Sequence, residues 1–304
     1  MDPITRAVLL SWEWRVAVLL PVLTLAVLYA VGWRLLRARS RSGNRLANGW
    51  RLAAYVGGLF FVLLALVSPI DVLSGQLFFM HMIQHLLLVM LAPPLLMLAN
   101  PLPFILWGLP ESGRRQVGGL LSRVLHRESG FRRLLRSITS PGIVWLLYVI
   151  FLLGWHEPTL YNAALRSALV HDIEHLTFFL SAMLYWWHVV GAGPRIHRQF
   201  GRAARMAYVI AAIPPTMLTG IAIAFANQPI YTYYLGVPRL WNLDVLSDQR
   251  ISGVVMWIPG SMMYIIAVLI LAARWLQGEE RKPPLPASTW ATEERMAAPG
   301  LDRT

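Results

Sequence analysis

The sequence predicts an all-α, polytopic membrane protein built as a bundle of seven transmembrane helices. Of its 304 residues, 57% are hydrophobic and only 14% are charged, a composition typical of proteins that lie in a bilayer. The hydrophobic residues gather in long apolar runs, and most arginines lie between these runs. Because a hydrocarbon core about 30 Å thick needs about 20 apolar residues per helix, such runs predict membrane-spanning helices.

Seven segments have the composition of spans. The first ends in arginines and lacks a small-residue cleavage site, so it predicts a retained helix and not a signal peptide. The fourth is short unless it begins near Ile138, and the pairs Pro93-Pro94 and Pro214-Pro215 predict kinks in the third and sixth. The predicted spans are Trp14 to Leu36, Trp50 to Val67, Gln76 to Leu98, Ile143 to Trp155, Leu169 to Val190, Arg205 to Ala226 and Gly253 to Trp275.

The arginines predict the orientation of the bundle. They concentrate in residues 37–51, 100–140 and 191–205 and in the C-terminal tail, whereas the alternate loops carry few of them. Positively charged loops stay on the cytoplasmic side of a membrane. The N terminus is therefore expected outside and the C terminus in the cytoplasm.

Residues 1–276 are expected to form one transmembrane domain with two appended features. Residues 113–137 place apolar side chains at helical spacing among arginines, which predicts a basic amphipathic segment on the anionic lipid of the cytoplasmic leaflet. Residues 277–304 are rich in proline and mixed charges and predict a disordered cytoplasmic tail. Membrane topology accounts for the net charge of +12, so nucleic acid is not an expected partner.

Most of the histidines are expected at the outer end of the bundle. Histidines four residues apart project from nearly the same helix face, so two such pairs on facing helices would make a metal site. Gln84 and Glu174 lie beside the two pairs and could hydrogen-bond the ring nitrogens that do not bind metal. The candidate metal ligands are His81, His85, His156, His171 and His175, with Asp248 at the same end of the seventh span.

The residue types favour copper as the bound metal. The chain has no cysteine, so a metal must be held by nitrogen, oxygen or thioether atoms. Imidazole with nearby thioether suits copper, as Cu(I) or Cu(II), then zinc, then iron in haem. Met80, Met82 and Met256 could serve as weak, exchangeable ligands. Because imidazole binds metal only when deprotonated, affinity is expected to fall below about pH 6.5.

Other functions remain open at this point. A proton or water pathway and structural hydrogen bonding could also use these histidines, and pairs on two helices could hold haem for electron transfer. A copper transporter would need polar groups through the inner half of the bundle, where residues 86–99 are entirely apolar. No nucleophile with a base at useful spacing occurs, so an enzyme is not expected.

Four motifs carry a family resemblance. They are MHMIQHLLLVMLAPPLLMLANP (Met80 to Pro101), WHEPTLYNAAL (Trp155 to Leu165), LVHDIEHLTFFLSAMLYWW (Leu169 to Trp187) and DQRISGVVMWIPG (Asp248 to Gly260). In this order they resemble the bacterial cytochrome c oxidase assembly factors of the CtaG type, over roughly residues 15–275.

The resemblance implies a seven-helix protein of the bacterial plasma (inner) membrane that helps copper reach the catalytic subunit of a haem–copper oxidase. The partners that it implies are that subunit and a copper donor protein. It also implies importance for the six candidate ligands, each of which lies within one of the motifs. Assembly factors of the single-helix type offer copper through a cysteine pair, which this chain lacks, so it would have to act differently.

Overall fold

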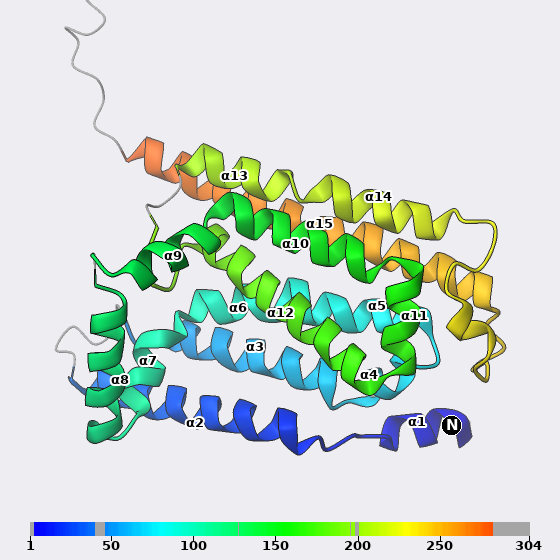
Figure 1. Cartoon of the computed structure of the whole chain (residues 1–304), viewed down its shortest axis with the longest axis horizontal. Coiled ribbons are helices and arrows are strands. Elements are labelled where there is room, and N and C mark those ends of the chain that lie inside the picture. Colours follow the sequence, from blue (N-terminus) through cyan, green and yellow to red (C-terminus); the bar gives the residue numbers. More distant parts are fainter. Residues whose placement is uncertain (1–2, 40–45, 127, 195, 198–200, 282–304) are drawn as a thin grey trace, which may run out of the picture.

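The computed structural model describes residues 3–39, 46–126, 128–194, 196–197 and 201–281, and all the regular structure in them is helical (Figure 1). The first part of the chain forms α1 (Pro3–Leu10), α2 (Val16–Arg39), α3 (Gly49–Leu66), α4 (Pro69–Ser74), α5 (Phe78–Leu86), the π-helical turn η1 (Leu87–Leu91), α6 (Ala92–Ala99), α7 (Pro101–Gly108), α8 (Glu111–Val124) and α9 (Gly130–Ile138). The second part forms α10 (Pro141–Trp155), α11 (Pro158–Arg166), α12 (Ala168–Val190), α13 (Arg202–Ile210), α14 (Ile213–Ala224), the 3-10 turn η2 (Thr232–Leu235) and α15 (Val245–Glu280).

All seven predicted spans are largely helical, but not all have the length and hydropathy of a membrane span. Five candidate spans meet both criteria among the described residues, and a sixth is added if α9 and α10, bent by 50°, count together. The bend lies just before Pro141, whose ring disfavours helix at the preceding residue. Helix α12 is not among these candidates, and its acidic and histidine side chains lower its hydropathy. The count of seven spans and the orientation of the termini stay predictions.

The long helices lie side by side, so the bundle has two ends (Figure 1). We call the end where α5 and α12 begin and α10 ends the histidine end. The opposite end, where α2 and α15 finish and where α8 and α9 lie, is the arginine end. The predicted outer face corresponds to the histidine end.

The two proline pairs interrupt their helices, as the sequence predicted. The π-helical turn η1 precedes Pro93-Pro94, and α13 gives way to α14 just before Pro214-Pro215. Pro93 has no N–H to donate to the carbonyl four residues earlier, that of Val89. The indole Nε1 of Trp186 in α12 donates to this oxygen instead, at 2.9 Å. The kink therefore ties the third predicted span to the fifth.

The segments outside the bundle differ in part from expectation. Residues 113–137 fall into two helices, α8 and α9, neither of which has a buried residue, and their binding to lipid stays a prediction. Helix α15 continues to Glu280, so the first residues of the predicted disordered tail are helical. Residues 282–304 of that tail lie outside the described residues.

Glycines hold α2 against α7 toward the arginine end. A Cβ atom added at Gly32 would overlap the carbonyl of Phe104, and one at Gly108 would overlap that of Leu28. The two backbones can approach this closely only because neither glycine carries a side chain. Helix α2 is thereby anchored through its C-terminal half, and its N-terminal half extends to the histidine end.

Candidate metal centre

Four of the predicted ligands meet between α5 and α12. The ring centroids of His81 and His85 lie 4.2 Å apart on α5, and those of His171 and His175 lie 4.1 Å apart on α12. Across the interface, His81 lies 5.1 Å from His171 and His85 lies 5.5 Å from His175. The two histidine pairs therefore face each other, as their helical spacing predicted.

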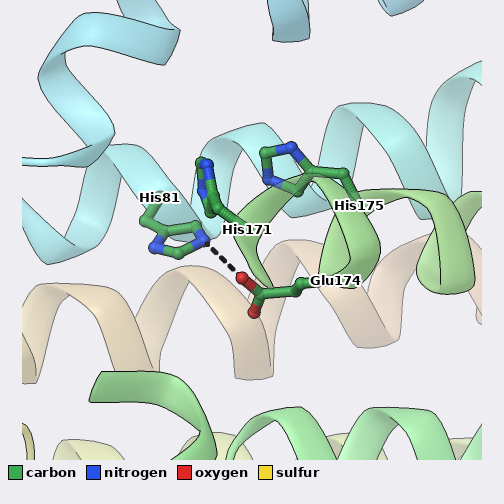
Figure 2. Close-up of side chains that lie close together, drawn as sticks. All are labelled: His81, His171, Glu174 and His175. Atoms are coloured by element: carbon green, nitrogen blue, oxygen red, sulfur yellow. Dashed lines mark ion pairs between the residues drawn. The ribbon is translucent and has the colours of Figure 1, made fainter. Parts of the chain in front are cut away.

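Glu174 joins this group from α12 (Figure 2). Its side chain is fully buried, with Oε2 3.7 Å from His81 Nε2 and Oε1 3.6 Å from His85 Nε2. One ligating atom each from His81, His171, Glu174 and His175 can be chosen so that all lie within 4.8 Å of one another. The sequence analysis gave Glu174 only a supporting role, whereas the geometry makes it a candidate ligand.

Hydrogen bonds orient two of the imidazoles. The Nδ1 atom of His81 lies 2.8 Å from the hydroxyl of Tyr161, which leaves Nε2 toward Glu174. The Nδ1 atom of His156 lies 2.7 Å from the carbonyl oxygen of Leu152. Because a carbonyl only accepts, this Nδ1 carries the proton and Nε2 offers a lone pair. Histidines that bind metal are commonly held in this way through the other ring nitrogen.

His156 lies at the edge of the group. It follows the last residue of α10, and its ring centroid is 6.2 Å from that of His85. Both histidines line a small cavity of about 40 Å³ together with Met82 and Met256. Two of the three methionines predicted as weak ligands thus lie beside the histidines, whereas Met80 is not among the residues lining this cavity.

Buried polar atoms without hydrogen-bond partners concentrate here. Buried polar groups in proteins are normally hydrogen-bonded, so such a concentration calls for an explanation. Among these atoms, nitrogen and carboxylate oxygen atoms of four side chains come close enough together to fit a cation, which they could bind through their lone pairs. The unpartnered atoms are His81 Nε2, both ring nitrogens of His85 and His175, Nε2 of His156 and His171, and both carboxylate oxygens of Glu174.

Asp248 and Gln84 lie apart from this group and have other partners. The Asp248 carboxylate accepts from the backbone N–H groups of Phe78 and Phe79 at 2.9 and 3.0 Å, and from Arg239 at 2.8 Å. It therefore caps α5 and sets the position of the helix that carries His81. Gln84 donates to the Ala65 carbonyl and to Asp71, and not to a histidine.

Three buried tyrosines that the sequence did not predict as site residues lie around the histidines. Tyr161 and Tyr234 both lie within hydrogen-bonding distance of His81 Nδ1, and the Tyr231 hydroxyl donates to the carbonyl of His156. Tyr161 belongs to a motif that the sequence analysis singled out, so its place there was a usable signal. Tyr231 and Tyr234 follow α14, and only folding brings them to the site.

The middle of the bundle is more polar than the sequence analysis expected. Residues 86–99 are entirely apolar, but neighbouring helices add polar groups: Tyr148 of α10 and Tyr264 of α15 place their hydroxyls 2.7 Å apart, and the Thr216 hydroxyl of α14 lies 3.4 Å from that of Tyr264. We call these three residues the tyrosine layer. Their hydroxyls are hydrogen-bonded to one another, so the layer has no need of a ligand.

The remaining three histidines lie outside the candidate metal centre. His188 Nε2 lies 2.9 Å from the carbonyl oxygen of Thr139, and His197 Nε2 lies 2.8 Å from the hydroxyl of the same threonine. His126 occupies an exposed turn after α8.

The site and the helical fold together define a membrane protein with a candidate metal centre. The profile of one family, described as cytochrome c oxidase caa3 assembly factor (Caa3_CtaG), matches residues 27–278. The chain belongs to this family, and the resemblance drawn from its motifs is confirmed.

The curated relatives of the chain are mycobacterial. Uncharacterized proteins of Mycobacterium bovis and Mycobacterium tuberculosis are each 25% identical over 283 residues, covering 92% of this chain and 41% of theirs. An uncharacterized protein of Mycobacterium leprae is 24% identical over 274 residues, covering 89% of this chain and 40% of its own. The chain thus spans about two fifths of the length of these relatives. No solved structure matches it significantly.

Proposed function

We propose that this protein is a membrane-embedded assembly factor for a haem–copper cytochrome c oxidase that binds copper at the histidine end and delivers it to the catalytic subunit. The observation that carries the proposal is the convergence of ligating atoms from His81, His171, Glu174 and His175 within 4.8 Å of one another. His85 and His156 border this group and are secondary candidates. Membership of an oxidase assembly family supports the same function.

The donor set favours copper over other metals. Imidazole nitrogens predominate, thioethers lie nearby and the chain has no cysteine. Such a set suits copper better than hard cations, which prefer oxygen ligands. Copper is cargo in this function and not a catalytic cofactor, which agrees with the non-catalytic role expected of an assembly factor.

Asp248 has a positioning role in this proposal. It was predicted as a ligand from its place in the sequence, but its carboxylate already holds the N terminus of α5 and Arg239. The proposed copper ligands therefore exclude it.

We place the protein in the bacterial plasma membrane with the histidine end outward. Its proposed partners are the oxidase catalytic subunit and a copper donor protein. The apolar helices and the concentration of arginine at the opposite end support this topology.

Haem and transport are weaker alternatives. The imidazoles pack directly against one another, with centroid separations of 4.1–5.5 Å, which suits a compact ion better than a planar macrocycle. An absorbance spectrum distinguishes a haem site from a copper site, because haem gives a Soret band. Transport would require copper to cross the tyrosine layer, where the hydroxyls are already paired.

Copper titration of the purified protein tests the proposal. The wild type is expected to bind copper at about pH 7.5 and to bind it more weakly at about pH 5.5, because protonated imidazole is no ligand. The double variant His81→Ala/His171→Ala is expected to lose binding and oxidase maturation in cells. His188→Ala at the arginine end is the matched control and should retain both. Equal binding at the two pH values, or none at either, contradicts the proposal.

A further inference from the structure

A cleft leads from the surface of the helical bundle toward the candidate metal centre. Its volume is about 490 Å³, and residues of α2, α3 and α12 line it. Val18 and Val22 of α2 form part of one wall, and Leu176 and Leu180 of α12 form part of the other. His175, which is 5% exposed and has no hydrogen-bond partner on either ring nitrogen, also lines the cleft. The cleft therefore connects the surface with a candidate ligand.

The cleft is apolar along most of its length and charged where α2 begins. Arg15 and Asp172 line this charged part. Arg15 contacts Asp172 at 3.3 Å, Asp71 at 3.2 Å and Glu13 at 3.2 Å. Its guanidinium thus joins the segment before α2 to α4 and α12.

Arg15 holds the place that an incoming cation would take. Asp172 is 62% exposed and adjoins His171, whereas the Asp71 side chain is only 3% exposed. A cation entering the cleft toward His175 would meet the Asp172 carboxylate first, and Arg15 neutralises both this carboxylate and the buried one of Asp71. A guanidinium this close also repels a second cation, because the charges interact across a partly desolvated region.

We propose that the cleft between α2 and α12 is the route of copper exchange and that Arg15 is its gate. The inference rests on the proposed function and adds the route and the controlling residue. When Arg15 leaves Asp172, this carboxylate binds the ion in passing and releases it to His171 and His175. No redox step is involved.

The charge of Arg15 is tested by the rate at which Cu(I) leaves the full-length protein for a coloured chelator. Arg15→Gln removes the charge and is expected to speed exchange about tenfold, the scale of one unit charge at a partly screened site. Arg15→Lys keeps the charge and should exchange at nearly the wild-type rate. Equal rates for wild type and Arg15→Gln, with copper bound to both, overturn the gate.

The route has a separate test. Because the natural chain has no cysteine, a single introduced cysteine can be labelled selectively. Leu176→Cys places a thiol in the cleft, and modification with a bulky maleimide is expected to slow Cu(I) release about tenfold while leaving the amount bound unchanged. Leu153→Cys on α10 is the matched control, since Leu153 and Leu176 are similarly exposed at 49% and 56%. Equal slowing at both positions, or at neither, overturns the route. A wild type that binds no copper would instead refute the proposed function.

Discussion

The histidine end and the tyrosine layer both bury polar side chains in an apolar bundle, but they treat these groups differently. In the tyrosine layer each hydroxyl has a partner, as with Tyr148 and Tyr264 at 2.7 Å. At the histidine end, nine unpartnered nitrogen and oxygen atoms gather on six side chains. Buried polarity by itself therefore does not mark a site. Unpartnered atoms that converge mark a candidate site, because binding of a ligand would compensate their desolvation.

Replacing Glu174 by leucine should give the largest effect and the sharpest test of this contrast. The variant loses a candidate ligand, so copper affinity is expected to fall about 100-fold. Because it also removes two unpartnered buried oxygens, the metal-free protein should become more stable by about 1–3 kcal/mol. Copper titration and thermal unfolding measure the two effects. A loss of stability without copper would show that Glu174 is satisfied within the fold.

Weakening the cap on α5 should give an intermediate effect on both properties. Asp248→Asn leaves one oxygen to accept from Phe78 or Phe79 and removes the ion pair with Arg239. We expect a stability loss of about 2 kcal/mol. Copper affinity should fall about tenfold as His81 moves, a smaller loss than for Glu174→Leu. A loss as large as that of Glu174→Leu would restore Asp248 as a ligand.

In the tyrosine layer, removing a hydroxyl should reduce stability alone. Tyr264→Phe leaves the hydroxyls of Tyr148 and Thr216 without this partner and is expected to cost about 1 kcal/mol. Copper affinity should match the wild type, because the layer contributes no ligand. Altered copper binding in this variant would mean that the two regions are coupled.

Asp71 should act only through the pH dependence of stability. Burial raises the pKa of Asp71 from its ordinary value of 3.8 to about 6, although Arg15 and Gln84 oppose the rise. The folded protein therefore holds this proton more tightly than the unfolded chain, and the associated stability is lost as pH rises from about 4 through 6. Relative to Asp71→Asn, the wild type should lose about 2 kcal/mol across this range. If the free energy of unfolding changed equally with pH in wild type and Asp71→Asn, the raised pKa of Asp71 would be contradicted.

Local sequence patterns predicted much of the site. Spacing of four residues placed His81 with His85 and His171 with His175 on single helix faces, and folding brought the faces together. Local patterns could not place Asp248, because the backbone N–H groups of α5 that it accepts from lie about 170 residues away along the chain. Nor could they predict Glu174 as a candidate ligand, because the direction of its side chain relative to α5 depends on how α5 and α12 cross.

The sequence by itself determined that the chain forms long apolar helices, where prolines interrupt them, and at which end most histidines lie, because these properties follow from residues near one another in the chain. Tertiary structure decided which polar atoms find partners. Trp186 satisfies the Val89 carbonyl and Tyr148 meets Tyr264, whereas the imidazoles around Glu174 meet few donors or acceptors. Hydrogen bonding between helices depends on their packing, and packing is a property of the whole bundle.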